Sequence, residues 1–405
     1  VAMTTRERFM TVSSRIMNPE TSSIASVSEL LHTLNPRKPV YCVYPHVYQQ
    51  TARSFVSDFP GRVLYAVKAN DDPLIIRLLN QGGVEHFDCA SVPEIELVRE
   101  NCPGATCYFM IPVALRGAAG EAFHDFDVRH FMVDDASRLD ALASEIPLEQ
   151  AVVFARMAVS HESAMMDLSS KFGAPPAEIP ALLRKIVATG AEPALAFNVG
   201  TLVTDPGAYR HAIETAAEVL NALDFRLRLI DIGGGFPRSY PGFVSPPLEE
   251  FFSAVREAAA GLPMQDEGEI MAEPGRALSA PGLSAVVEVL LRKGRRLYLN
   301  DGMYGIFWEL RFEGHQRFPV RAYRKGERLE GNPVSFRLFG PTCDASDVMP
   351  GEVELPSGIQ AGDHLEFGNI GAYSLSGRTR FNGHYSDLIV EITSSAESPP
   401  KIEQA

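Results

Sequence analysis

The 405-residue sequence lacks a long uninterrupted run of apolar residues and contains only five cysteines and one tryptophan. A membrane-spanning helix needs roughly 18 or more consecutive apolar residues, so we expect no membrane segment. Residues 1–20 include arginines but no apolar core, which argues against a secretion signal. The cysteines show no CxxC or metal-ligand spacing and are Cys42, Cys89, Cys102, Cys107 and Cys343. We therefore expect reduced thiols, no bound metal and a cytoplasmic location.

The sequence also has no excess of positive charge. It contains 37 lysines and arginines against 51 acidic residues, which gives a formal net charge of -14. Nucleic-acid binding depends on basic residues that release counterions from phosphates, and we see no basic stretch for this task. We therefore expect neither a nucleic-acid partner nor a membrane partner, and a cationic small molecule suits the acidic balance better.

The sequence does contain a regular alternation of strand and helix patterns. The expected strands are 63–67, 86–89, 106–110, 129–133, 151–158, 195–199, 228–232 and 270–272. Repeated strand-then-helix units predict a parallel sheet with right-handed crossovers, and about eight such units predict a closed barrel. We therefore predict an α/β fold with a (β/α)8 TIM barrel over residues 46–280.

After residue 280 the pattern changes to short strands separated by glycine and proline. The expected strands are 285–291, 296–300, 334–338, 364–367 and 387–390. This spacing predicts an all-β domain over residues 281–405. Residues 1–45 are expected to join it, because the apolar segment 40–43 precedes the first barrel helix.

One lysine follows an apolar run directly, in the segment Tyr65-Ala-Val-Lys68-Ala-Asn70. At the end of a barrel strand it would lie where such enzymes carry catalytic groups. Apolar surroundings would lower the pKa of Lys68 and give an amine able to form a Schiff base. From this segment alone, a lysine that extends its charged end into water is the better interpretation.

Two further motifs follow predicted strands. In Asp231-Ile-Gly233-Gly-Gly235, consecutive glycines allow several backbone N–H groups to converge on a phosphate, although they also serve simple tight turns. In Glu273-Pro-Gly-Arg276, the arginine could hold phosphate oxygens, and a plain ion-paired turn is the alternative.

Together the motifs supply an amine, a phosphate cradle and a carboxylate at the same end of the barrel. These are the groups that pyridoxal 5'-phosphate (PLP) requires. The amine binds its aldehyde, the cradle binds its phosphate, and the acid keeps its pyridine nitrogen protonated. Glu273 is the candidate for that acid.

Five more motifs complete a resemblance to a known family. They are Phe87-Asp-Cys-Ala-Ser91, Ser169-Ser-Lys-Phe-Gly173, Asn300-Asp-Gly-Met-Tyr304, Gly340-Pro-Thr-Cys343-Asp344 and Asn369-Ile-Gly-Ala-Tyr373. The chain resembles the PLP-dependent ornithine/lysine/arginine/diaminopimelate decarboxylases, which have an alanine-racemase-like barrel, and is most similar to the eukaryotic type of ornithine decarboxylase. The resemblance runs from about residue 41 to residue 387.

The resemblance implies a decarboxylase of a basic L-amino acid, with a role in polyamine synthesis and a homodimer whose active sites are shared between subunits. Lys68 and Cys343 match the catalytic positions, the first as the Schiff-base lysine and the second as a proton donor from the other subunit. The cofactor-binding positions match Lys68, Asp88, Arg156, Asn198, Thr201, Gly233, Gly234, Gly235, Glu273, Gly275, Arg276 and Tyr373. The substrate-binding positions match Phe312, Glu313 and Asp344.

Some residues depart from the family pattern. Asn198 replaces the usual histidine that stacks on the cofactor ring, and Thr201 replaces a serine while retaining its hydroxyl group. Glu313 replaces an aspartate that binds the distal amine, and Trp308 lies in the same loop. A longer side chain at position 313 favours a shorter diamino acid or a shifted substrate. An amino-acid racemase and a catalytically silent regulatory homologue remain alternative interpretations.

Overall fold

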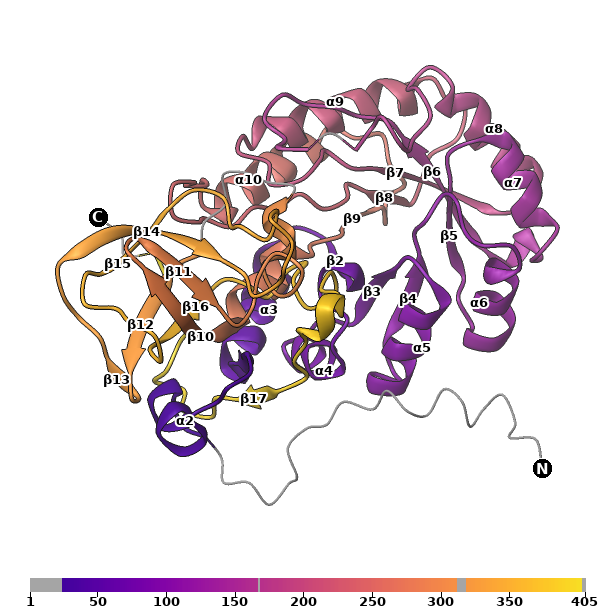
Figure 1. The fold of residues 1–405 in the computed structure, drawn as a ribbon. Coiled ribbons are helices and arrows are strands. Elements are labelled where there is room, and N and C mark those ends of the chain that lie inside the picture. Colours follow the sequence, from indigo (N-terminus) through magenta and orange to yellow (C-terminus); the bar gives the residue numbers. More distant parts are fainter. Residues whose placement is uncertain (1–23, 167, 312–317, 403–405) are drawn as a thin grey trace, which may run out of the picture. The chain divides into compact units, whose positions relative to one another are not determined.

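The computed structural model describes residues 24–166, 168–311 and 318–402. The chain divides into two compact units (Figure 1). The barrel unit comprises Val47–Pro281 and Gly371–Ser376, and the sheet unit comprises the described parts of Val1–His46, Gly282–Ile370 and Gly377–Ala405. No helix among the described residues is long and apolar enough to cross a membrane.

The barrel unit contains a closed parallel barrel in which strands β2 to β9 pair in chain order. The strands are β2 Arg62–Ala66, β3 His86–Cys89, β4 Thr106–Phe109, β5 His130–Val133, β6 Val152–Met157, β7 Glu192–Phe197, β8 Leu229–Asp231 and β9 Glu269–Ala272. Helices surround the strands in Figure 1. This arrangement confirms the predicted (β/α)8 barrel.

Two helices of the barrel unit that begin with a side-chain cap are α4 Pro73–Gln81 and α5 Val92–Asn101. Asp72 caps α4 by accepting a hydrogen bond from the Leu74 N–H at 2.9 Å. The Ser91 side chain caps α5 by accepting one from the Glu94 N–H. The helices are α3 Pro45–Asp58, α4 Pro73–Gln81, α5 Val92–Asn101, α6 Ala118–Phe126, α7 Ala136–Ala143, α8 Ile179–Ala188, α9 Gly207–Asn221, α10 Leu248–Ala259 and α11 Arg276–Ser279. The sequence did not predict α6, which begins after Gly117 in a left-handed conformation, with φ of 82°.

Apolar side chains fill the barrel, and polar ones gather at the start of its strands. Arg62 donates to the Tyr108 hydroxyl at 2.7 Å, and the Tyr108 ring stacks on His130 at 4.0 Å between centroids. Burial, aided by the charge of Arg62, lowers the pKa of His86 to about 4 and that of His130 to about 3. These histidines are therefore neutral at neutral pH.

The sheet unit contains a nine-stranded sheet with the order β13-β12-β16-β10-β11-β14-β15, to which β1 and β17 are attached. Its elements are α2 Val27–Leu34, β1 Val40–Val43, β10 Leu283–Lys293, β11 Arg296–Leu299, β12 Val320–Arg324, β13 Glu327–Arg328, β14 Pro333–Phe339, β15 Val353–Pro356, β16 His364–Phe367 and β17 Ile389–Glu391. Strand β1 pairs antiparallel with β10 and parallel with β17. The N-terminal strand is therefore part of this sheet.

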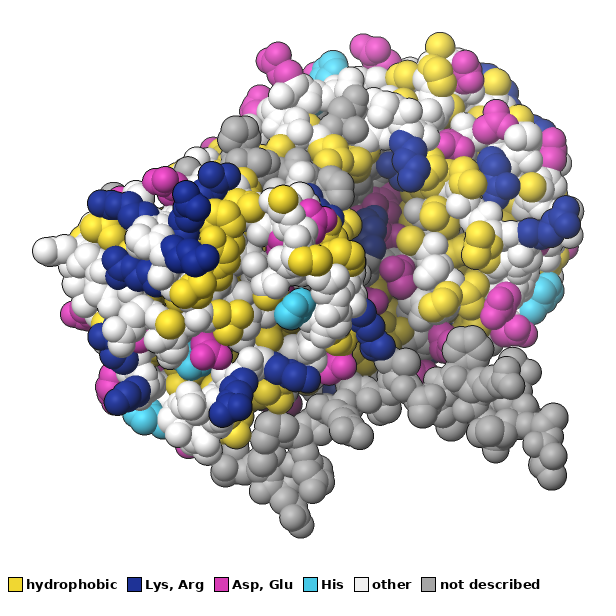
Figure 2. All heavy atoms as spheres, in the orientation of Figure 1, with side chains coloured by type: hydrophobic (Ala, Val, Ile, Leu, Met, Phe, Trp, Pro, Cys, Tyr) yellow, Lys and Arg dark blue, Asp and Glu magenta, His cyan; other side chains and the backbone are white. Residues whose placement is uncertain are grey.

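One surface feature of the sheet unit contradicts the expectation of no basic stretch. Figure 2 shows lysine and arginine side chains gathered on part of this unit. Arg292 and Lys293 end β10, Arg295 lies in the turn that follows, and Arg296 begins β11. The expectation overlooked this turn, because a net charge hides a local cluster of the opposite sign.

Candidate active site

Lys68 lies immediately after β2, in the short 3-10 helix Val67–Ala69. Its Nζ atom is 3.3 Å from Oδ2 of Asp88, which lies on the neighbouring strand β3 opposite Ala66. The lysine side chain is 49% exposed, whereas the Asp88 side chain is 3% exposed. A buried carboxylate is thus paired with an accessible amine at the carboxyl end of the barrel.

The expected lowering of the lysine pKa is wrong for this arrangement. The negative charge of Asp88 raises the pKa of Lys68 well above its ordinary value and outweighs the opposite effect of burial, and Glu273 adds to the increase. The sequence shows the apolar run before the lysine but not the carboxylate on the next strand. Among the protein groups alone, Lys68 is therefore an ammonium.

The three glycines after β8 lie against other backbone segments. A Cβ atom would lie 2.5 Å from the Phe197 oxygen at Gly233, 2.7 Å from the Glu273 oxygen at Gly234, and 2.6 Å from the Gly200 oxygen at Gly235. Gly233 and Gly235 also have positive φ angles of 73° and 97°. At Gly233 and Gly235, only glycine allows both the close approach of another backbone segment and a positive φ without strain.

The glycine loop presents unused hydrogen-bond donors. Gly233 donates its N–H to Oδ1 of Asp231 at 2.8 Å. Within the described part of the chain, the N–H groups of Gly234 and Gly235 have no acceptor. Backbone N–H groups without acceptors beside a cavity form a site for an anion such as phosphate.

Arg276, the first residue of α11, lines the same cavity as the glycine loop. Its side chain is held by two tyrosines: Nη1 donates to the Tyr240 hydroxyl at 3.2 Å, and the guanidinium lies 5.2 Å from the Tyr373 ring centroid. Tyr373 has a left-handed backbone with φ of 53°, and its N–H donates to the Ala69 oxygen at 2.7 Å. The segment carrying Tyr373 is therefore fixed beside Lys68.

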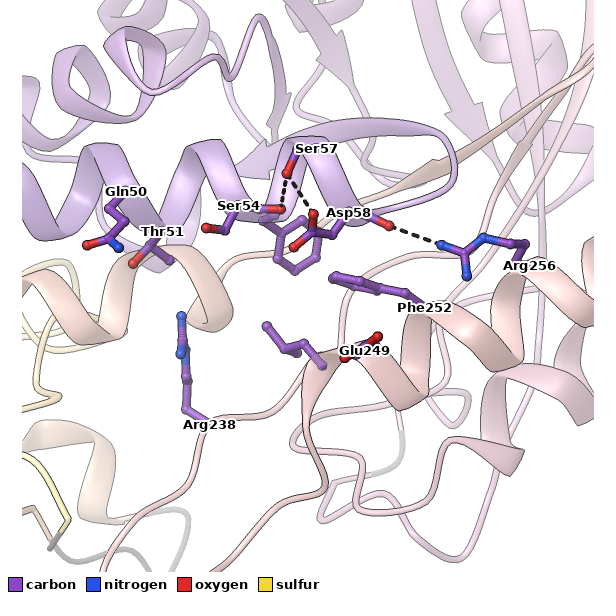
Figure 3. Close-up of a pocket in the computed structure, with 11 residues that line it drawn as sticks. Gln50, Thr51, Ser54, Ser57, Asp58, Arg238, Glu249, Phe252 and Arg256 are labelled. Carbon is purple, nitrogen blue, oxygen red and sulfur yellow. Dashed lines mark hydrogen bonds between the residues drawn. The ribbon is translucent and has the colours of Figure 1, made fainter. Parts of the chain in front are cut away.

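Arg238, in the loop between β8 and α10, supports the start of α11. Its Nη2 and Nε atoms donate to the Ala277 oxygen at 2.7 and 3.1 Å. Its side chain lines a separate cavity of about 700 Å³ and points toward Thr51 on α3 (Figure 3). That cavity contains neither Lys68 nor the glycine loop, so cavity size alone does not locate the site.

Glu273 follows β9 and is 8% exposed. Its Oε1 atom and Oδ2 of Asp231 are buried without a hydrogen-bond partner among the described residues. Burial and the charge of Asp231 raise the pKa of Glu273 well above its ordinary value. Burial, with a further contribution from Asp88, raises the pKa of Asp231 to about 7. A buried carboxyl oxygen without a partner is costly, and it suits a ligand group that donates a hydrogen bond.

A single cavity gathers many of the predicted cofactor residues. It is lined by Lys68, Asn198, Thr201, Gly234, Gly235, Glu273, Gly275, Arg276 and Tyr373, together with Ala66, Leu168, Gly200, Leu202 and Phe236. Asn198 accepts a hydrogen bond from the Gly200 N–H at 2.9 Å, and Thr201 donates its N–H to the Met166 oxygen at 3.2 Å. Arg156, on β6, is half-buried and contacts the Met132 sulfur at 3.9 Å.

Comparison with known proteins gives this cavity a chemical context. Residues 46–280 match the pyridoxal binding domain of pyridoxal-dependent decarboxylases, and residues 282–371 match their C-terminal sheet domain. The chain belongs to this decarboxylase family. It is therefore a PLP-dependent carboxy-lyase that acts on amino acids, and PLP is its cofactor.

The relatives include lysine/ornithine decarboxylases and a protein named antizyme inhibitor 2. A lysine/ornithine decarboxylase of Selenomonas ruminantium is 32% identical over 80% of this chain and 81% of its own length. An antizyme inhibitor 2 of Xenopus laevis is 29% identical over 79% and 73% of the two chains. The structure of a lysine/ornithine decarboxylase complexed with putrescine from Vibrio vulnificus matches with a TM-score of 0.78 and 26% identity, over 90% of this chain and 96% of that one.

The residues of the cavity fit the family cofactor. The amides of Gly234 and Gly235 with Arg276 suit a phosphate, the Glu273 oxygen suits a protonated pyridine nitrogen, and Lys68 supplies an amine. Sequence reasoning gave no role to Asp231, which holds the Gly233 N–H, to Tyr240, which contacts Arg276, or to Arg238, which contacts Ala277. Asp231 could have been found as the last residue of a strand before a glycine loop, whereas nothing in the sequence pointed to the other two.

Of the other predicted residues, the structure describes Cys343, Asp344 and Trp308, all of which belong to the sheet unit. Cys343 and Asp344 belong to the sheet unit, in the loop after β14, where Cys343 is exposed and Asp344 half-buried. Trp308 is half-buried at the start of the 3-10 helix Trp308–Arg311. Phe312 and Glu313 lie outside the described residues.

Proposed function

We propose that the chain decarboxylates a basic diamino L-amino acid, ornithine- or lysine-like, and releases CO2 and a di- or polyamine. Asp344 carries this proposal. Its carboxylate accepts hydrogen bonds from the Tyr304 hydroxyl and, at 2.8 Å, from the Ser346 N–H. The bond from Tyr304, followed by that from Ser346, holds the pKa of Asp344 below its ordinary value. An ionised carboxylate next to Cys343 suits the distal ammonium of a diamino acid.

The residues of the barrel unit hold the cofactor for this reaction. Lys68 binds it through its amine, Gly234, Gly235 and Arg276 bind its phosphate, and Glu273 keeps a proton at its ring nitrogen. Asp88, Arg156, Asn198, Thr201, Gly233, Gly275 and Tyr373 complete the set of cofactor-binding residues. Bound PLP supplies an electron sink for the electron pair that remains when the α-carboxylate departs as CO2.

The later proton transfers use the chain's own residues. Cys343, contributed by a second copy of the chain, donates a proton to the α-carbon, and Lys68 releases the amine product. This arrangement requires a homodimer with shared active sites. A cytoplasmic location and a role in polyamine synthesis are part of the same proposal.

A CO2-release screen tests this proposal. The substrates are the L- and D-forms of ornithine, lysine and 2,4-diaminobutyrate, and each amine product is identified by mass spectrometry. We expect turnover of L-ornithine or L-lysine and its loss in Lys68→Ala. Absence of CO2 from every amino acid tested would contradict the proposal.

Two alternatives have specific support. The extra methylene of Glu313 favours a shorter diamino acid, and a preference for 2,4-diaminobutyrate in the same screen would support it.

The similarity to antizyme inhibitor 2 favours a catalytically silent regulator. That alternative predicts no turnover, whereas Lys68 beside Asp88 and the unpartnered oxygen of Glu273 favour an active enzyme.

A further inference from the structure

A short turn in the sheet unit, here called the 379–383 turn, is attached to the loop that carries Tyr304. The Thr379 N–H and hydroxyl both donate to the backbone carbonyl oxygen of Tyr304, at 2.8 and 3.0 Å. The Phe381 ring stacks on the Tyr304 ring, with centroids 4.2 Å apart and planes inclined by 22°. The turn is thus fixed to the residue whose hydroxyl donates to Asp344.

The same turn reaches Cys343 through Asn382. The Asn382 Nδ2 atom donates to the Cys343 sulfur at 3.1 Å. Asn382 has a left-handed backbone with φ of 53°, which asparagine adopts more readily than most residues. This backbone conformation directs the Asn382 side-chain amide toward the Cys343 sulfur. The neighbouring residue Phe381, stacked on Tyr304, holds the turn in place.

The loop that carries Cys343 is held independently from its other side. Asp347 accepts hydrogen bonds from the Met303 N–H at 2.7 Å, from the Thr342 N–H at 3.1 Å and from the Thr342 hydroxyl at 2.7 Å. Both ends of the N–H···S contact are therefore built on anchored backbone. This contact is a defined feature of the sheet unit.

We propose that Asn382 is a positioning residue for the Cys343 thiol, an inference that rests on the function proposed above. Its amide N–H occupies one side of the sulfur, so the S–H bond points elsewhere. During turnover the S–H proton moves to the α-carbon, which carries the electron pair left by the broken bond to CO2. The Asn382 hydrogen bond stabilises the resulting thiolate, which then takes a proton from water.

Alkylation of the holoenzyme measures this contact without requiring turnover. Four of the five cysteines are buried, so a brief treatment with iodoacetamide reports on Cys343, and Cys343→Ser provides the blank. Asn382→Gly retains the left-handed backbone and removes only the amide, whereas Asn382→Asp retains the shape and places a negative charge beside the sulfur. Thermal unfolding verifies that each variant folds.

The expected order of alkylation rates at about pH 8 is wild type, Asn382→Gly and then Asn382→Asp, with each step about three- to tenfold slower. Turnover of the best amino acid should fall in kcat with little change in KM. An Asn382→Gly variant that is alkylated at the wild-type rate overturns the proposal. Slower alkylation in a protein that decarboxylates no amino acid would leave Asn382 as the residue that positions the thiol and would refute the proposed function instead.

Discussion

Asp231 and Glu273 are neighbouring buried carboxyl groups, and each has an oxygen without a hydrogen-bond partner among the described residues. They differ in one respect. Asp231 uses its other oxygen to hold the Gly233 N–H at 2.8 Å, whereas Glu273 lines the cavity that contains Lys68. The first residue therefore supports the glycine loop, and the second is available to the cofactor.

Substitution of these two carboxyl groups should separate their roles. Glu273→Gln removes the acid that keeps the ring nitrogen protonated, so we expect kcat to fall by roughly 100-fold while PLP remains bound. Asp231→Asn retains an oxygen for the Gly233 N–H and should cost less than about tenfold. Steady-state CO2 release and the visible absorbance of bound cofactor measure both effects. Equal losses in the two variants would contradict the assignment.

The glycine loop should not tolerate a single added methyl group. In Gly235→Ala a Cβ atom would lie 2.6 Å from the Gly200 oxygen on a backbone with φ of 97°, so the loop must shift. We expect a loss of stability of about 1–3 kcal/mol and weaker PLP binding. Gly104→Ala is the matched control, because nothing lies within 4 Å of its added Cβ. Urea unfolding and PLP titration of the apoprotein give the two quantities.

Arg238 should affect cofactor binding from outside the cofactor cavity. Arg238→Ala removes both hydrogen bonds to the Ala277 oxygen and loosens the turn that carries Arg276. We expect PLP affinity to fall by about tenfold. Arg256→Ala is the control, because Arg256 lines the same cavity as Arg238 but donates to the Asp58 backbone oxygen, at 3.3 Å, rather than to α11 (Figure 3). Comparable PLP affinities in the two variants would show that Arg238 does not support Arg276.

The histidines at the start of the barrel strands should make stability depend on pH. The folded pKa values of His86 and His130, about 4 and 3, lie below the ordinary value of 6.5. Their contribution is fully present above about pH 6.5 and decreases as the pH falls, because the unfolded chain binds more protons there. Urea unfolding at about pH 7 and pH 4.5 should reveal this loss, and His130→Asn should reduce it. An unchanged pH dependence in His130→Asn would refute this explanation.

The sequence was sufficient to predict the parts of the fold and site that depend on local pattern. Alternating apolar strands and helices predicted the barrel, and Lys68, the three glycines and Arg276 were found because each follows a strand. Parallel strands of a barrel place their carboxyl ends on one face, so residues far apart in sequence could be grouped before their positions were known. Helix α6 was missed because it begins after Gly117, which supplies no side-chain cap, and contains a second glycine, Gly120.

The remaining features depend on contacts between strands and loops. The increase in the pKa of Lys68 comes from Asp88 on the adjacent strand, and the support of Arg276 comes from Arg238 and Tyr240 in another loop. Such contacts follow from strand register and loop conformation, which a single sequence does not contain. The same limitation concealed the contact between Asn382 and Cys343.

Borohydride reduction of the holoenzyme followed by peptide mass spectrometry tests the central claim most directly. If Lys68 binds PLP through its amine, reduction should fix the cofactor to the peptide that contains Lys68. The Lys68→Arg variant, which keeps the positive charge beside Asp88, should yield no such adduct. Cofactor attached to a different lysine, or an adduct that persists in Lys68→Arg, would contradict the assignment of Lys68.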